Sequence, residues 1–184
     1  TSSLNAMCKR TRSVLTTVGP YQLYGTPLVA ACAASGTDYL DLNGEPAWAR
    51  QMIDAHQETA KKSGARIVLS AGFDSIPFDL GVWFLQQEAI QKFGKPAPRV
   101  KGRVRKMQGG ASGGTMASMK ATLKASIKDP SILGLLNNPF ALTPGFTGPA
   151  QPSGLVPEYD KNLGVWAAPF VMAPINTKNV HRTN

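Results

Sequence analysis

Two segments carry the strongest structural signal in the chain, Val18-Gly19-Pro20-Tyr21-Gln22-Leu23-Tyr24-Gly25 and, about fifty residues later, Ala71-Gly72-Phe73-Asp74-Ser75-Ile76-Pro77-Phe78-Asp79-Leu80-Gly81. Each stretch follows a short apolar segment and precedes a segment with helical spacing, so each closes a strand and opens a helix. Ligands of open parallel sheets bind beyond the carboxyl ends of the strands. Two such turns on one sheet edge therefore predict a ligand-binding crevice.

Strand and helix patterns alternate around these two stretches. Apolar and β-branched residues predict three strands, over residues 13–18, 39–42 and 66–71. Helical spacing, with proline in first turns and glycine at the ends, predicts helices over residues 27–35, 46–63 and 77–93. Strands that alternate with helices in this way form right-handed units of a parallel sheet. The first half of the chain is therefore predicted to have an α/β fold.

A break rich in Pro and Gly, Gly94-Lys95-Pro96-Ala97-Pro98, predicts a domain boundary. It divides the chain into a first domain, residues 1–94, and a second α/β domain, residues 99–184, which we expect to be incomplete.

In the second domain, basic and apolar residues alternate over residues 99–106, which predicts a strand with one basic face. A glycine turn then leads to a predicted helix near residues 115–128. Residues 137–157 are rich in Pro and Gly and predict an irregular excursion or a mobile cover over a site. Residues 166–175 are apolar enough to predict a returning strand.

The charge of the chain is unevenly distributed. Its 184 residues carry a net charge of +9. Residues 1–98 contain nine Lys and Arg and eight Asp and Glu. Residues 99–184 contain eleven Lys and Arg and only three Asp and Glu. A basic surface attracts phosphate, anionic lipid or acidic protein without specifying which. No nucleic-acid-binding module is recognisable, so nucleic acid is not an expected partner.

Cysteine content and hydropathy indicate the cellular compartment in which the protein is expected to reside. Cys8 and Cys32 are too few for a disulfide framework, and because no Cys/His spacing suggests zinc, no metal is expected. We expect both thiols to be buried packing residues. Reduced thiols in a cytoplasmic compartment are therefore the default. No apolar run is long enough to span a bilayer. The first residue is Thr1, without an initiator Met, and we expect the chain to be part of a longer protein.

The two stretches quoted above, Val18–Gly25 and Ala71–Gly81, together with Tyr39-Leu40-Asp41-Leu42-Asn43-Gly44-Glu45, closely resemble the saccharopine dehydrogenase-like oxidoreductases, in particular the branch that contains trans-acting enoyl reductases. The resemblance is strong over residues 4–94 and weaker beyond them, where it rests on Ser112-Gly113-Gly114-Thr115 and the segment Ala168–Asn176. The element Gly72-Phe73-Asp74-Ser75-Ile76-Pro77 is the most specific. The chain looks like an internal fragment of such an enzyme.

The resemblance implies an NAD- or NADP-dependent oxidoreductase that transfers hydride to the double bond of an enoyl or lipid-like acyl chain carried by another protein. Residues 1–94 would be the later strand–helix units of a Rossmann-type domain. The implied cofactor-binding residues are Val18, Gly19, Pro20, Tyr21, Gly72, Phe73, Asp74 and Ser75, and the implied substrate-binding residues are Ser112, Gly113, Gly114 and Thr115. The glycine fingerprint that holds a dinucleotide pyrophosphate, G-x-G-x-x-G, is absent from the chain and is expected upstream of Thr1. This segment alone is therefore expected to bind cofactor weakly or not at all.

The proton donor is open among three candidates, Tyr21, Tyr24 and Asp74. The two tyrosines could equally line an aromatic wall, and Asp74 or Ser75 could cap the following helix. Asp41 and Glu45 could act as acid and base, but solvated carboxylates at the rim of the sheet are the expected case.

A rival motif is Gly110-Ala111-Ser112-Gly113-Gly114, which satisfies the G-x-S-x-G pattern of serine hydrolases. Asp129 or Asp160, followed by His181, would complete a triad. The strand before a hydrolase elbow should be apolar on both faces, whereas residues 99–106 are basic at alternate positions. A serine hydrolase is therefore a less favoured prediction than an oxidoreductase.

A non-catalytic binding or membrane-associated protein that keeps the fold is the main alternative to an oxidoreductase. In either case the basic segment Arg99–Lys106 could contact an acidic protein or a membrane surface, or could simply be a solvated face. A homodimer is left open.

Overall fold

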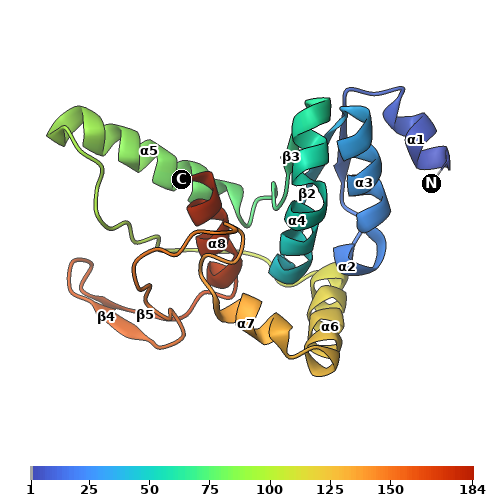
Figure 1. Cartoon of the computed structure of the whole chain (residues 1–184). Helices are drawn as coiled ribbons and strands as arrows, with labels where there is room; N and C mark the ends of the chain where they lie inside the picture. The colour runs from blue at the N-terminus through green and yellow to red at the C-terminus, as the bar shows by residue number, and fades with distance from the viewer. Residues whose placement is uncertain (1) are drawn as a thin grey trace.

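The computed structural model describes residues 2–184, which form a mixed α/β structure with eight helices (Figure 1). Its central feature is a three-stranded parallel sheet in the order β1-β2-β3. The strands are β1 (Ser13–Thr16), β2 (Asp38–Asp41) and β3 (Ile67–Val68). The predicted parallel α/β arrangement is confirmed, although β3 is shorter than the 66–71 segment suggested.

Helices connect the strands as the sequence predicts. The connections are α2 (Tyr21–Tyr24) and α3 (Thr26–Ser35) between β1 and β2, α4 (Pro46–Ser63) between β2 and β3, and α5 (Ile76–Phe93) after β3. Gly36 and Gly64 end α3 and α4 in the left-handed conformation, with φ of 72° and 81°. These helix ends were readable from sequence because only glycine adopts this conformation without strain.

The core lies between the sheet and the helices α1 (Ser2–Cys8), α3 and α4. Its members share near-complete burial: Cys8, Tyr21, Val29, Ala31, Cys32, Tyr39, Trp48 and Met52. The two thiols are buried and free, with their Sγ atoms 3.7 Å apart. Burial raises the pKa of Cys32 to about 12, so this thiol stays protonated and acts as a packing residue.

The second half contains three helices and a hairpin. The helices are α6 (Gly113–Lys128), α7 (Ser131–Asn137) and α8 (Ala173–Thr183), and β4 (Glu158–Asp160) pairs antiparallel with β5 (Val165–Ala167). In Figure 1, α5, α8 and the hairpin lie to one side of α4 and the parallel sheet, and α6 lies below α2. The predicted helix near residues 115–128 is confirmed by α6.

The strand predicted over residues 99–106 is wrong, because these residues have no regular structure and no neighbouring strand pairs with them. Two of their basic side chains instead form ion pairs with the hairpin. Arg103 contacts Glu158 and Asp160, at 2.6 and 3.2 Å, and Lys101 contacts Glu158 at 3.2 Å. The alternation of basic and apolar residues reflects these contacts rather than a sheet.

The strand predicted over residues 166–175 is also wrong beyond Ala167, because Pro174 stands in the first turn of α8. The segment 138–157 is irregular as predicted. The prediction of a mobile cover does not hold for the whole segment, because Phe140, Ala141 and Leu142 are buried. Leu142 packs in a cluster with Ile175.

No helix within residues 2–184 is long and apolar enough to cross a membrane. In the same residues, no group of three or more His, Cys, Asp or Glu side chains is arranged to hold a metal ion.

Candidate functional site

The candidate site lies at the carboxyl ends of the three parallel strands, and a buried aspartate organises it. Asp41 ends β2 and is fully buried. Its Oδ1 accepts hydrogen bonds from Asn43 N, Asn43 Nδ2 and Ser70 N at 2.6 to 3.0 Å, and its Oδ2 accepts one from the Tyr39 hydroxyl at 3.0 Å. Burial raises the pKa of Asp41, although the hydrogen bonds from Asn43 and Ser70 oppose the shift.

This carboxylate joins the end of β2 to the turn that follows β3. Ser70, the residue that donates to Asp41, has a φ of 58°, and its hydroxyl donates to Asn43 O at 2.7 Å. A serine in the left-handed region is uncommon and needs support from its surroundings. Asp41 and Asn43 supply that support, so they fix the direction in which the chain enters the Gly72–Ser75 turn.

Glu45 is a second buried carboxylate, with 3% of its surface exposed. It accepts hydrogen bonds from the backbone N–H groups of Tyr21 and Gln22, both at 2.9 Å, and from the Ser118 hydroxyl of α6 at 2.7 Å. Gln22 also donates to Thr122 of α6 at 3.0 Å. Glu45 thus satisfies the free N–H groups at the start of α2 and ties α6 to the turn after β1. The expectation that Asp41 and Glu45 are solvated is wrong.

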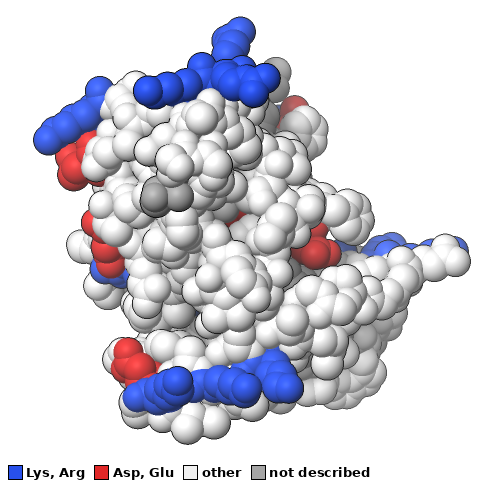
Figure 2. Space-filling view, turned by 90° about the vertical axis from the view of Figure 1, so that its right-hand side faces the viewer, with Lys and Arg blue, Asp and Glu red and all other residues white. Residues whose placement is uncertain are grey.

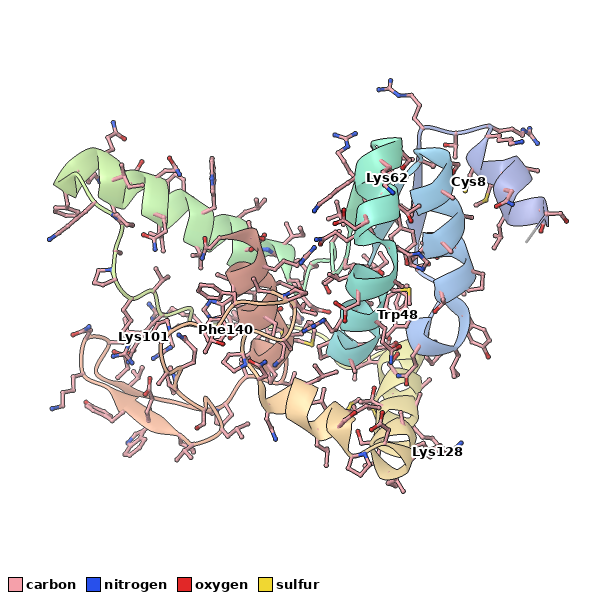
Figure 3. The ribbon with its side chains drawn as sticks, in the orientation of Figure 1. Cys8, Trp48, Lys62, Lys101, Lys128 and Phe140 are labelled. Atoms are coloured by element: carbon pink, nitrogen blue, oxygen red, sulfur yellow. The ribbon has the colours of Figure 1, made fainter. Side chains whose placement is uncertain are left out.

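Tyr21 connects the first two strand ends. Its hydroxyl donates to Thr16 O at 3.1 Å and accepts from Leu42 N at 3.2 Å, and its ring lies 5.6 Å from that of Trp48. Figure 3 shows Trp48 on α4 at the level of α2. Burial raises the pKa of Tyr21. Both backbone contacts hold the hydroxyl in place, so the geometry gives Tyr21 a clear structural role, while its role as proton donor stays a prediction.

The other two candidate proton donors are more accessible. Tyr24 is 61% exposed, and Asp74 lies on the surface of the turn after β3. Either side chain can therefore meet a ligand without a change in the fold. Their roles also stay predictions.

The Gly72–Ser75 turn is held from the far end of the chain. Asn176 of α8, 4% exposed, donates from Nδ2 to Asp74 O at 2.8 Å and accepts from the Ser75 hydroxyl at 3.0 Å. Two of the motifs singled out in the sequence therefore meet in space. Gly72 lies against Leu42, where an added Cβ would come within 3.0 Å of Leu42 Cδ2. The turns after β2 and β3 are thus in contact.

The predicted cofactor residues divide into buried and exposed members. Pro20, Tyr21 and Ser75 are buried, whereas Val18 and Phe73 are 62% and 82% exposed. The buried members fix the two turns, and the exposed members present apolar surface at the sheet edge. The sequence identified the turns, but it missed Glu45 and Asn176 as the residues that hold them.

The predicted substrate residues Ser112–Thr115 form the start of α6. Ser112 caps this helix, since its Oγ accepts a hydrogen bond from Thr115 N at 3.2 Å. No strand precedes it, because residues 95–112 are irregular, so Ser112 lacks the strand–turn–helix setting that a hydrolase nucleophile requires. His181, the histidine of the rival triad, lies within α8, with its ring 4.5 Å from that of Phe140.

Replacing Asn176 with alanine removes both hydrogen bonds to the Gly72–Ser75 turn. We expect the free energy of unfolding to fall by about 2 kcal/mol, because the Ser75 hydroxyl is buried and loses its partner. The matched control is Asn137→Ala at the exposed end of α7, which should change stability by less than about 0.5 kcal/mol. Urea denaturation followed by circular dichroism measures both. Equal effects would contradict the role given to Asn176.

Replacing Ser118 with alanine tests the contact between α6 and Glu45. Glu45 keeps its two backbone donors, so we expect a smaller loss, about 1 kcal/mol. Ser131→Ala is the control, since Ser131 is exposed at the start of α7 and contacts Asp129 rather than Glu45. Proteolysis should also cleave the α6 region of Ser118→Ala faster than that of the control. A variant as stable and as resistant as the control would show that α6 is held by other contacts.

Comparisons with known proteins give a consistent result. No family model and no solved structure matches the chain. Curated relatives do match it along its whole length. A Mycobacterium tuberculosis protein with the provisional name trans-acting enoyl reductase is 45% identical, and the trans-acting enoyl reductases of Mycobacterium leprae and Mycobacterium ulcerans are 40% and 39% identical. The match covers 100% of this chain but 46% of each relative. The chain thus spans about half the length of its curated relatives and is homologous throughout to proteins named trans-acting enoyl reductase.

Proposed function

We propose that the protein is part of an NAD- or NADP-dependent oxidoreductase of the saccharopine dehydrogenase-like type, which reduces the double bond of an enoyl-acyl substrate by hydride transfer. The names of its relatives support the reaction class. The observation that carries the proposal is the convergence of the Gly19–Tyr21 and Gly72–Ser75 turns at the carboxyl edge of a parallel sheet, where open α/β sheets bind their ligands.

The residues at this edge fit the nicotinamide half of a dinucleotide. Gly19 and Gly72 have no side chain and are partly exposed, so a ligand can approach the backbone of both turns, and Phe73 offers an exposed aromatic face next to Gly72. The bound cofactor would supply the hydride. Within this chain, Asp41, Glu45 and Asn176 hold the turns in position, and Tyr24 or Asp74 is the side chain free to donate a proton.

The proposed substrate is an acyl chain attached to an acidic carrier protein, with Arg99–Lys106 as the docking segment. Arg103 and Lys101 are already paired with the hairpin, which leaves the remaining basic side chains of the segment exposed. A second basic surface lies on α6, where Lys120, Lys124 and Lys128 are exposed on successive turns; Figure 2 shows blue side chains gathered at this lower end. Both surfaces suit an acidic partner.

The test compares this chain with a longer protein that extends upstream of Thr1 and includes a glycine fingerprint. NADH and NADPH are titrated against each, and nicotinamide fluorescence is followed. We expect binding by the longer protein only, followed by nucleotide oxidation when an enoyl thioester is added. Absence of binding by both would overturn the proposal and favour a non-catalytic binding protein.

A further inference from the structure

The structure contains a cavity of about 500 Å³ that none of the contacts above explains. It lies between α4 and β3 on one side and the start of α5 and α8 on the other. Its volume falls within the range of small-molecule sites, roughly 300–1,000 Å³. One end reaches Ser70 and Ser75, at the turn where we place the nicotinamide, and the other reaches Ala65 at the beginning of β3.

The walls of this cavity are apolar. They are formed by Met52, Ile53 and Ala60 of α4, by Ile67 and Val68 of β3, and by Leu142 of the irregular segment. Four of these six side chains are buried, while Val68 is 41% exposed. A ligand that fills the cavity must therefore be apolar along most of its length.

Two basic side chains, Lys61 and Arg182, also line the cavity. The acidic group among the lining residues, Asp79, accepts a hydrogen bond from the Thr183 hydroxyl through Oδ2 at 2.9 Å, while its Oδ1 is buried without a partner among residues 2–184. Arg182 is itself held by Leu142 O and Gln57. These basic side chains disfavour a cationic amphiphile.

We propose that the cavity binds the hydrocarbon chain of an acyl substrate, with the reactive end of the chain at Ser75 and the tail along β3. The inference rests on the proposed function, because the enoyl group must reach the turn after β3 while the rest of the chain leaves the aqueous phase. An apolar channel that begins at this turn provides the path.

The experiment measures binding of cis-parinaric acid, a fluorescent fatty acid, to this chain in the absence of nucleotide. Val68→Trp fills the cavity from the exposed strand edge, and Leu123→Trp adds the same side chain on α6, away from the cavity. We expect saturable binding by the unmodified chain and by Leu123→Trp, and at least a tenfold weaker affinity for Val68→Trp. Hexadecanoic acid should displace the probe.

Two results would overturn the proposal: no saturable binding by the unmodified chain, or equal affinity in Val68→Trp. If Val68→Trp fails to fold, Thr183→Trp fills the cavity from the last turn of α8 and replaces it. A peptide that competes with the probe by pairing with β3 would point instead to a strand as the natural occupant.

Failure of this proposal and failure of the proposed function are distinguishable. If Val68→Trp loses fatty-acid binding but the longer protein binds no nucleotide, the acyl-chain site is supported and the proposed reductase function is rejected. In an active longer protein, Val68→Trp should raise the KM for a long-chain enoyl thioester at least fivefold and leave that for a four-carbon enoyl thioester unchanged. An equal effect on both substrates would reject the channel but retain the reductase.

Discussion

Replacing Trp48 with alanine is expected to lower the free energy of unfolding by about 4 kcal/mol, as large aromatic truncations in cores do. Trp48 is 3% exposed, its indole N–H donates to the Thr26 hydroxyl at 3.0 Å, and its ring packs on Tyr21. Gly25 lies so close that an added Cβ would be 2.7 Å from the indole. The site is tightly filled, so truncation leaves a void that the backbone cannot close.

The effect should extend to the candidate site, because the Tyr21 ring loses its neighbour while its hydroxyl still bridges β1 and β2. Urea denaturation gives the stability, and hydrogen exchange at Tyr21 and Leu42 gives the local effect. Trp83→Ala is the matched control, since Trp83 is 56% exposed on α5 and should lose less than about 1 kcal/mol. Similar losses at both positions would show that the core does not depend on Trp48.

Replacing Asp41 with alanine should lower the free energy of unfolding by about 3 kcal/mol, because buried donors of Asn43, Ser70 and Tyr39 lose their acceptor together. Asp41→Asn is the control. Its amide oxygen can accept the same bonds as Oδ1, and its NH₂ can face the Tyr39 oxygen, so we expect a loss near 1 kcal/mol. Chemical denaturation distinguishes the two variants. An asparagine as harmful as alanine would show that the negative charge itself is required.

The same residue predicts a pH dependence. The pKa of Asp41 is raised in the folded protein by burial, above an unfolded value of about 4. Its contribution to stability is therefore fully present below the unfolded pKa and is lost as the pH rises through the folded pKa. The stability of the unmodified chain relative to Asp41→Asn should accordingly fall as the pH increases above about 4. A difference that is constant with pH would contradict the raised pKa.

Local sequence signals accounted for the first half of the fold. Pro46 and Gly64 mark the ends of α4 because each restricts the backbone at its own position, whatever surrounds it. The three strands were found for a similar reason, since apolar β-branched runs between helices have few other structures available. The two turns of the candidate site directly follow predicted strands, so their positions were predicted together with the strands.

The parts that sequence did not predict depend on distant partners. Basic and apolar residues alternate over residues 99–106 as they do in a strand. A segment with this pattern forms a strand only if a neighbouring strand pairs with it, and here Arg103 forms ion pairs with Glu158 and Asp160 instead. Glu45 was expected in solvent because glutamate usually is, and only the fold brings two N–H groups and a hydroxyl to it. Asn176, within an apolar motif, was a polar residue that needed a partner, and that signal could have identified it.

The hydrogen bonds between Asn176 and the turn after β3 join residues more than one hundred positions apart in the chain. Contacts of such long sequence separation form late, because the entropy of closing the intervening loop must be overcome first. During synthesis on the ribosome, the parallel sheet can assemble while α8 is still within the exit tunnel. The turn after β3 therefore gains its two hydrogen bonds to Asn176 only after α8 has emerged, so this part of the candidate site is completed after the sheet that carries it.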